Sequence, residues 1–454
     1  MLFLPARVLA ATAGAQGAVA SPSWISGLPF AGLLLSIALG PMFAPRTWHR
    51  WSGLVMLGWS VALLAGDAAV LGPAAAFASL RDAILVEYLP FIALLLALYV
   101  VAGGIVVVGG PWGRPAGNTA LLALGILLGG LVGTTAAAIT LIHPFLRANA
   151  HRSRKGHLVV FFIVLVANAG GALSPIGNPP LYVGFLQGVP FLWPLVWLSG
   201  PLLLLSAPLL LGFYLLDRHL ARSEQPAPRA EPLRLHGTGN LGLIVVLAAG
   251  GMMLGAWSGG ALSLFGARLP VGRLAGVLLC VVVGFVSVGI TPSAYRRRNR
   301  FSWAPMLEVA ELFAAVFVTI GPVRAMLQAG PAGPLAGLFD LVTNSAGEPV
   351  PAAYFWLTGI LSAFLDNAPT YLVFFGLAGN DASLLTGPLA RTLVAISAGS
   401  VFFGGLTYIG SAPNLMIRAI AAHAGVRMPG FFRYSLLAAL VLAGPLLLVT
   451  WAVR

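Results

Sequence analysis

The feature that most constrains this chain is a glycine- and proline-rich motif that occurs twice, once in each half of the sequence. Residues 171–180 (GALSPIGNPP) align with residues 404–413 (GGLTYIGSAP), and both copies interrupt long apolar runs. Such a break exposes backbone amides and carbonyls, so within a membrane it is tolerated only when buried in protein or lining a watery cavity. Two breaks at matching positions of two halves indicate where a membrane transporter would bind its cargo.

Composition defines the class of protein. The 454 residues are 59% hydrophobic and 8% charged, with a mean hydropathy of +0.95. Long apolar runs, each of about 20 residues, recur along the chain, which predicts an all-α polytopic membrane protein embedded in lipid. A β-barrel is excluded because barrel strands alternate in polarity and these runs do not. The single cysteine, Cys280, lies in an apolar run and is expected to be a small buried residue.

The +13 charge is explained by membrane topology. The Lys and Arg residues occupy short loops and not one polar face, so no nucleic-acid partner is expected. Residues 1–26 form a leader, which is either a cleaved secretory signal ending near Ala18-Val19-Ala20 or an uncleaved segment. Both interpretations place Ser21 outside the cytoplasm.

Twelve apolar segments are recognisable. Simple spans are predicted near 27–45, 51–72, 87–110, 157–187, 191–217, 240–257, 270–290, 303–327, 387–412 and 430–453. Two further segments, 117–146 and 352–379, are too long for one span and have polar residues at their centres. These residues are Gly133-Thr134-Thr135 in the first segment and Asp366-Asn367 in the second.

Loop charge predicts that both long segments are re-entrant hairpins. If 117–146 crossed the membrane, the basic cluster at 147–155 would lie outside, against the positive-inside rule. A hairpin keeps that cluster inside and places eighteen of 25 Lys and Arg residues in the cytoplasm. The alignment that superposes the two motifs also pairs Gly133 with Asp366. We therefore predict an inverted-topology repeat, with repeat 1 at 27–217, a cytoplasmic linker at 218–239 and repeat 2 at 240–454.

Hairpin tips and broken helices that meet at mid-membrane supply free helix ends and oxygen ligands, which Na⁺ favours. The candidate ion- or substrate-binding residues are Thr134, Thr135, Ser174, Gly177, Asn178, Asp366, Asn367, Thr370, Thr407, Gly410, Ser411 and Asn414. A carboxylate at the bilayer centre costs roughly 3 kcal/mol, so Asp366 is expected to handle an ion or proton. The alternative is a structural role as a helix cap, and the two roles are compatible.

Other polar residues within spans have a structural and a functional interpretation. Glu308 is a candidate for proton coupling, although it and Glu311 also suit the first turns of a helix. Asp67 and His143 are interpreted as structural residues near helix ends, with a proton relay as the alternative for His143. Arg324 is expected to pair with an acidic residue or to extend outward.

Residues 361–375 (LSAFLDNAPTYLVFF), 168–189 and 406–416 resemble the bacterial NhaD-type sodium:proton antiporters and, more closely, the related family of putative citrate transporters. Both belong to the ion-transporter superfamily, and the resemblance covers most of residues 115–435. It implies a bacterial inner-membrane transporter, commonly a homodimer, with elevator-like motion. It also implies an ion site at Thr134, Thr135, Asp366, Asn367 and the residues around Gly177 and Gly410. The chain departs from the family pattern at Asn178, where Asp is usual, and at Ser411, where Asn is usual, and this puts the ion stoichiometry in doubt.

The sequence is compatible with three functions. The first is sodium (cation):proton antiport. The second is Na⁺- or H⁺-coupled transport of citrate or another carboxylate. A basic residue at a hairpin tip would favour this second function, and neither tip has one. The third is a non-transporting membrane enzyme or scaffold, against which the paired broken helices argue. No enzyme motif, cofactor or tightly bound metal is expected, and transported Na⁺ or H⁺ is the cargo.

Overall fold

The computed structural model describes residues 23–110, 112–225, 231–255, 257, 259–299 and 301–453. Most of the predicted leader lies outside these residues, and its last part enters the short 3₁₀ helix η2 (Trp24–Gly27). The predicted all-α polytopic membrane fold is confirmed. Within the described ranges, seven helices are long and apolar enough to cross a membrane, or eight if the pair 306–319 and 321–328, bent by 43°, forms one span.

One set of helices, the peripheral group, packs around α4 and α13. Here α4 packs on α11, α11 on α10, and α13 on α2. The group comprises α1 (Leu28–Phe43), α2 (Pro45–Leu71), α3 (Pro73–Asp82), the π-helical η3 (Ala83–Tyr88), α4 (Leu89–Ala102), α10 (Gly239–Gly255), α11 (Val271–Ile290) and α13 (Ala304–Thr319). Short elements follow, namely α12 (Ser293–Arg298), α14 (Gly321–Gln328), η5 (Gly330–Ala332) and α15 (Ala336–Val342).

The second set, the central group, comes from two separate stretches of the chain. The first stretch contains α5 (Pro115–Val132), α6 (Thr134–Ala148), α7 (Gly156–Leu165), η4 (Ala169–Leu173), α8 (Pro179–Leu186) and α9 (Trp193–Ala221). The second contains α16 (Pro351–Leu365), α17 (Asn367–Leu377), α18 (Ala382–Thr386), α19 (Ala390–Phe402), η6 (Phe403–Leu406), α20 (Ala412–His423) and α21 (Phe431–Val453). Residues 158–172 and 392–405 are buried throughout, which explains why α7 is apolar on every face and why α19 carries no charged residue after Arg391.

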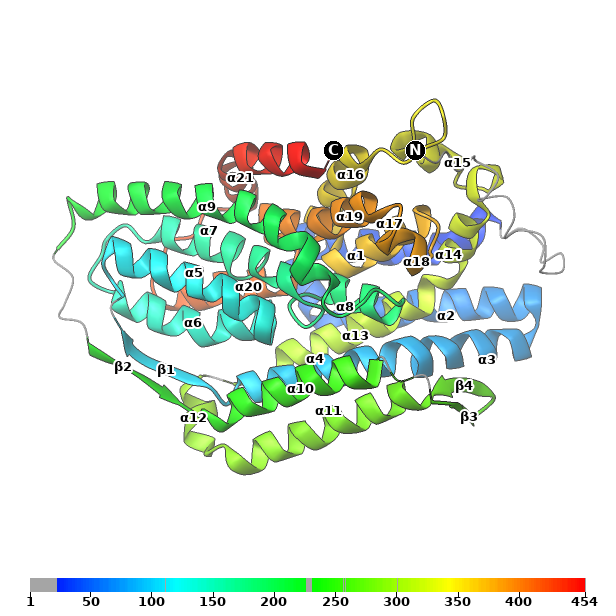
Figure 1. Ribbon diagram of the computed structural model, residues 1–454, viewed down its shortest axis with the longest axis horizontal. Coiled ribbons are helices and arrows are strands. Elements are labelled where there is room, and N and C mark those ends of the chain that lie inside the picture. Colours follow the sequence, from blue (N-terminus) through cyan, green and yellow to red (C-terminus); the bar gives the residue numbers. More distant parts are fainter. Residues whose placement is uncertain are drawn as a thin grey trace.

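Two helical hairpins form where the sequence predicts them. Helices α5 and α6 fold back at Gly133, and α16 and α17 fold back at Asp366. The two ends of each hairpin lie together, because Asn118 and Asn149 exchange amide hydrogen bonds of 2.9 Å and Tyr354 donates to the Leu377 carbonyl at 3.3 Å. In Figure 1 the first hairpin lies to the left of centre and the second to the right.

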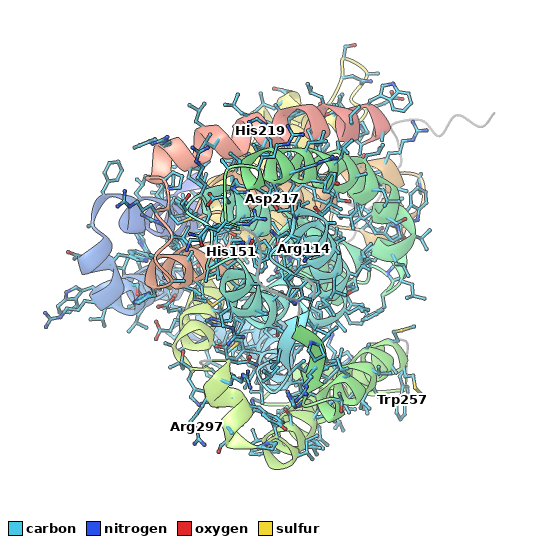
Figure 2. All side chains as sticks on the ribbon, turned by 90° about the vertical axis from the view of Figure 1, so that its left-hand side faces the viewer. Arg114, His151, Asp217, His219, Trp257 and Arg297 are labelled. Atoms are coloured by element: carbon cyan, nitrogen blue, oxygen red, sulfur yellow. The ribbon has the colours of Figure 1, made fainter. Side chains whose placement is uncertain are left out.

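Basic segments that are far apart in sequence gather at one end of the molecule, which we call the basic end. Arg152 contacts Asp217 and donates to the Gly113 carbonyl at 2.9 Å, while His236 packs on Tyr295 with ring centroids 5.4 Å apart. This end lies on the left of Figure 1, and Figure 2 looks onto it, with Arg114, His151, Asp217 and His219 labelled. The opposite end, called the far end, holds the turn between α2 and α3.

The predicted span at 87–110 is wrong in both of its boundaries. The helix begins at Pro73 and runs through α3, η3 and α4 to Ala102. Arg81 and Asp82 remain within it because they pair with each other at 2.8 Å. Residues 106–110 form the strand β1 (Val106–Gly110) and not helix, because Gly103 and Gly104 end α4 in a turn.

Two small antiparallel sheets lie outside the long helices. β1 pairs with β2 (Glu231–His236), which falls in the predicted linker. Because β1 connects α4 to α5 and β2 connects α9 to α10, this ribbon joins two of the three connections between the groups. At the far end, β3 (Ala261–Leu264) and β4 (Ala267–Pro270) form a hairpin. Its turn residues, Phe265 and Gly266, both have positive φ, as a tight two-residue turn requires.

Candidate functional site

The two copies of the repeated motif adopt the same local structure. In each copy a 3₁₀ turn, η4 or η6, leads through one extended residue, Ser174 or Thr407, into a tight turn and then into a short helix, α8 or α20. Ser174 donates its hydroxyl hydrogen bond to the Gly130 carbonyl, and Thr407 donates to the Ala363 carbonyl. The alignment that superposes the two motifs pairs these two acceptors as well. The same hydroxyls accept from the amides of Gly177 at 3.2 Å and Gly410 at 2.9 Å.

Glycine is required in these breaks because the backbone doubles back on itself. A Cβ atom at Gly177 would lie 2.4 Å from the Gly171 carbonyl oxygen, and one at Gly410 would lie 2.7 Å from that of Gly404. Both distances are too short for a side chain. The repeated glycines therefore permit a compact turn inside the protein.

Each break contacts the tip of a hairpin. The Thr134 amide, which begins α6, donates to the Gly177 carbonyl at 3.0 Å. At the second tip the Asn367 amide group is assigned with its nitrogen toward three acceptors, Ser362 Oγ, Ser400 O and Gly410 O, at 2.8, 3.1 and 2.8 Å. Hairpin tip and broken helix thus form one unit in each stretch of the central group.

The two units are joined by asparagines. The amide groups of Asn178 and Asn367 lie 3.4 Å apart. Asn168 donates to Asn414 Oδ1 at 2.8 Å, and Asn414 in turn donates to the carbonyls of Gly404 and Thr407 at 2.8 and 2.9 Å. All of these side chains are buried. The breaks therefore meet in one polar cluster.

Asp366 lies at the tip of the second hairpin with an uncommon backbone. Its φ and ψ are 71° and 154°, a region that glycine normally occupies, and Gly133 at the other tip has 87° and 143°. Its carboxylate Oδ1 accepts from the Asn367 amide at 2.6 Å, and Thr370 donates to its carbonyl at 2.9 Å. The half-buried carboxylate caps α17, which is the predicted structural role and leaves a second oxygen available.

The contacts above bring together most of the predicted binding residues. They connect Thr134, Ser174, Gly177, Asn178, Asp366, Asn367, Thr370, Thr407, Gly410 and Asn414. Thr135 follows Thr134 in α6, and the buried Ser411 precedes α20. Glu308 is not in this cluster, because its exposed side chain lies on α13, which packs on α2, η3 and α1.

Charge in the cluster is sparse. Among residues 130–137, 168–180, 362–370 and 404–414, Asp366 is the only Asp, Glu, Lys, Arg or His. Within the described part of the chain, no group of three or more His, Cys, Asp or Glu side chains is arranged to hold a metal ion. A cation bound here would therefore rely on one carboxylate together with amide, hydroxyl and backbone oxygens.

The sequence predictions missed one residue of the cluster and one at the base of the first hairpin. Asn168 is fully buried, and the signal that could have found it is a lone amide directly before the glycine pair of an apolar run. Asp217, also fully buried, accepts from Arg152, from Asn118 at 3.0 Å and from His157 at 2.9 Å. In the sequence Asp217 is the last residue of the predicted span 191–217 and is followed directly by Arg218. It therefore resembles an ordinary charged residue at a helix end.

Arg324 pairs with an acidic residue, one of the two predicted roles. Its Nη2 lies 2.6 Å from Glu87 Oε2, and Nη1 contacts the other carboxylate oxygen. The ion pair connects α14 to η3. Both side chains are partly buried, so the ion pair compensates part of the cost of removing two charges from water.

Comparison with known proteins identifies the family to which this chain belongs. The chain matches an uncharacterized transporter of Mycobacterium bovis and an uncharacterized transporter of Mycobacterium tuberculosis, each with 25% identity over 293 residues. The match covers 62% of this chain and 63% of each relative, so it spans less than two thirds of either relative's length. Residues 19–453 match the family described as "Putative citrate transport". The chain is a multi-pass membrane protein that belongs to this family.

Proposed function

We propose that the protein is a secondary active transporter that exchanges Na⁺, or a similar monovalent cation, for protons at Asp366. The observation that carries this proposal is the half-buried Asp366 carboxylate at a hairpin tip, which is the one charged side chain among the residues 130–137, 168–180, 362–370 and 404–414 that form the tips and breaks. A single carboxylate binds a cation when ionised and releases it when protonated. Competition of the two for one site is sufficient for coupled exchange.

The electrostatics of the cluster favour a cation over an anion. The ranges that form the breaks and tips contain one acidic residue and no Lys, Arg or His. Helix starts would otherwise attract a carboxylate through their free amides. However, α8 begins with Pro179-Pro180, and α20 carries Pro413 at its second position, so three of these amides are missing.

Coupled transport of citrate or another carboxylate is the second candidate. The description of the family favours it. Replacement of the usual Asp by Asn178 would reduce repulsion of an anion, and the buried Asn178 amide nitrogen, which has no hydrogen-bond partner among the described residues, could supply an N–H donor. A carboxylate substrate would then bind beside a cation held at Asp366.

The proposal includes alternating access by the central group. In it, the peripheral group is a fixed scaffold in a bacterial inner membrane and the central group carries the cargo. The matching geometry of the two breaks and the facing hairpins support an inverted-topology repeat, and the resemblance described above favours a homodimer with elevator-like motion.

The test is transport by purified protein in proteoliposomes that contain a pH-sensitive dye. We expect Na⁺ or Li⁺ gradients to drive proton movement in the wild type and not in Asp366→Asn. A matched control is Asp381→Asn, because Asp381 also caps a helix, accepting from the Ser383 amide at 2.8 Å, but lies in an exposed loop before α18. Unchanged cation-driven proton flux in Asp366→Asn would contradict the proposal. Citrate uptake without cation-driven alkalinisation would favour the second candidate.

A further inference from the structure

Two side chains join the peripheral group to α8 on the side of the far end. The hydroxyl of Tyr182, buried on α8, donates to the Pro90 carbonyl of α4 at 3.1 Å. Arg273, near the start of α11, donates to the Leu186 carbonyl at 2.8 Å and to the Val86 carbonyl of η3 at 3.3 Å. Leu186 ends α8, where carbonyls lack helical partners and a cation is favourable. We call Tyr182 and Arg273 the far-end latch.

The helix that the latch holds is closely coupled to Asp366. Helix α8 packs on α17, and the approach is so close that a Cβ atom at Gly184 would lie 2.3 Å from the Tyr371 hydroxyl. At its start, Asn178 lies 3.4 Å from Asn367, the neighbour of Asp366. A shift of α8 away from α4 would therefore carry the hairpin tip with it.

The contact between the groups is different toward the basic end. There a cavity of about 180 Å³ lies between α4, α6 and α20, beside the place where α4 packs on α6. Tyr99 and Gly103 line its peripheral side, and Ile139, His143 and Met416 line its central side. The volume has room for about six water molecules, at about 30 Å³ each. Helices α6 and α20 both begin at the polar cluster, so these walls of the cavity lead to the site.

The same helix, α4, therefore meets the central group through a direct hydrogen bond at one level and beside a cavity at another. Pro90, which accepts from Tyr182, and Tyr99, which lines the cavity, are nine residues apart, or about 14 Å along a helix. The latch is on the side of η3 and β4, whereas the cavity adjoins the residues that lead into β1 at the basic end.

We propose that this arrangement is the state of the transporter that is closed toward the far end and open toward the basic end, and that Tyr182 and Arg273 are the positioning residues that hold it. The inference rests on the proposed alternating access. Exposure of the site toward the far end requires α8 to leave α4 and α11, and both latch contacts must then break. Loss of the latch shifts the population away from the state open at the basic end.

A labelling experiment tests this without requiring transport. In a Cys280→Ala background in nanodiscs, an Ile139→Cys reporter is labelled with a hydrophilic maleimide. We expect Tyr182→Phe combined with Arg273→Gln to lower the labelling rate at least threefold. Tyr354→Phe is the matched control, because its hydroxyl bond to the Leu377 carbonyl lies within the central group. Equal labelling of the latch variant and the wild type would overturn the inference.

A cross-linking experiment provides the second test. Cysteines replace Val86 and Leu186, whose carbonyls bind the same guanidinium, and a short reducible methanethiosulfonate reagent joins them. We expect cross-linking to reduce flux at least tenfold and reduction to restore it. Ser263→Cys with Arg268→Cys, partners across the β3–β4 hairpin, is the control and should retain flux when cross-linked. Undiminished cation-driven flux after positions 86 and 186 have been cross-linked would overturn the proposed latch. Absence of all cation-driven flux before cross-linking would instead contradict the proposed function, while the labelling result would still stand.

Discussion

At the scale of single residues, the backbone of Asp366 is the most informative feature. A side chain in the region normally reserved for glycine costs about 1–3 kcal/mol, and the other hairpin tip uses Gly133 for the same conformation. The chain retains a strained aspartate where glycine would be easier. This favours a role for the carboxylate beyond the turn itself.

The first prediction contrasts the two tips. We expect Asp366→Gly to stabilise the protein by about 1 kcal/mol, because relief of backbone strain outweighs the entropy gained by the unfolded chain and the lost cap. The same variant should lose cation-driven proton flux. Thermal unfolding in detergent, followed beside the flux assay, gives both quantities.

Gly133→Ala provides the matching change in the opposite direction. A Cβ atom there would lie 3.3 Å from the Ile176 carbonyl oxygen, a slightly tight contact, and φ is 87°. We therefore expect a loss of about 1–3 kcal/mol, mainly from backbone strain. If Asp366→Gly destabilised the protein as strongly as Gly133→Ala, the strain argument would fail.

At the scale of elements, a buried ionic network ties the first hairpin to α7 and α9. Arg152 and Asp217 have 2% and 0% of their side chains exposed, and Asn118, Asn149 and His157 complete the network. The second prediction is that Asp217→Leu costs about 3–5 kcal/mol, because it leaves the Arg152 charge buried and unpaired. Adding Arg152→Met should recover part of that loss. A double-mutant cycle on unfolding measures the coupling, and strictly additive losses would contradict it.

The third prediction concerns the loop that follows α6. Glu224 accepts from the Ser153 amide at 2.8 Å, from the Ser153 hydroxyl at 2.7 Å and from the Arg154 amide at 2.9 Å. These bonds, led by that of the Ser153 amide, lower the pKa of Glu224 from 4.5 to about 2. A depressed carboxyl pKa stabilises the fold above the unfolded pKa, so this contribution is constant above pH 4.5 and disappears as pH falls toward 2. The difference in unfolding temperature between the wild type and Glu224→Gln should shrink over that window, and a difference independent of pH would exclude the effect.

The elements also show what sequence can and cannot predict. The hairpin tips at Gly133 and Asp366 and the breaks near Gly177 and Gly410 were predictable, because helix breaks have local signals in glycine, proline and polar residues. The network around Asp217 was not, because it depends on which loops meet after packing. The strand pairing of β1 with β2 was missed for the same reason, since its partners, such as Val106 and His236, are far apart in the sequence.

At the scale of the whole molecule, the gathering of the basic loops provides an internal check on topology. Loops separated by the first hairpin, by α7–α9 and by the linker contact one another at the basic end. The turn of the β3–β4 hairpin lies at the far end in Figure 1. By the positive-inside rule we expect the basic end to face the cytoplasm.

The last prediction follows from this arrangement. In a Cys280→Ala background, Arg114→Cys and Arg154→Cys should react with an impermeant maleimide from the same side of the membrane, although they lie before and after the first hairpin. Ser263→Cys, in β3 at the far end, should react from the other side. All three positions are exposed. The reason is that Arg152, two residues before Arg154, donates to the Gly113 carbonyl beside Arg114, so a full crossing by α5 and α6 would have to break that contact. Labelling of Arg114→Cys and Arg154→Cys from opposite sides would refute the re-entrant hairpin. It would also refute the inverted relation between the two halves. That relation requires a first hairpin that returns to the basic end, because only then do the two broken helices approach the site from opposite directions.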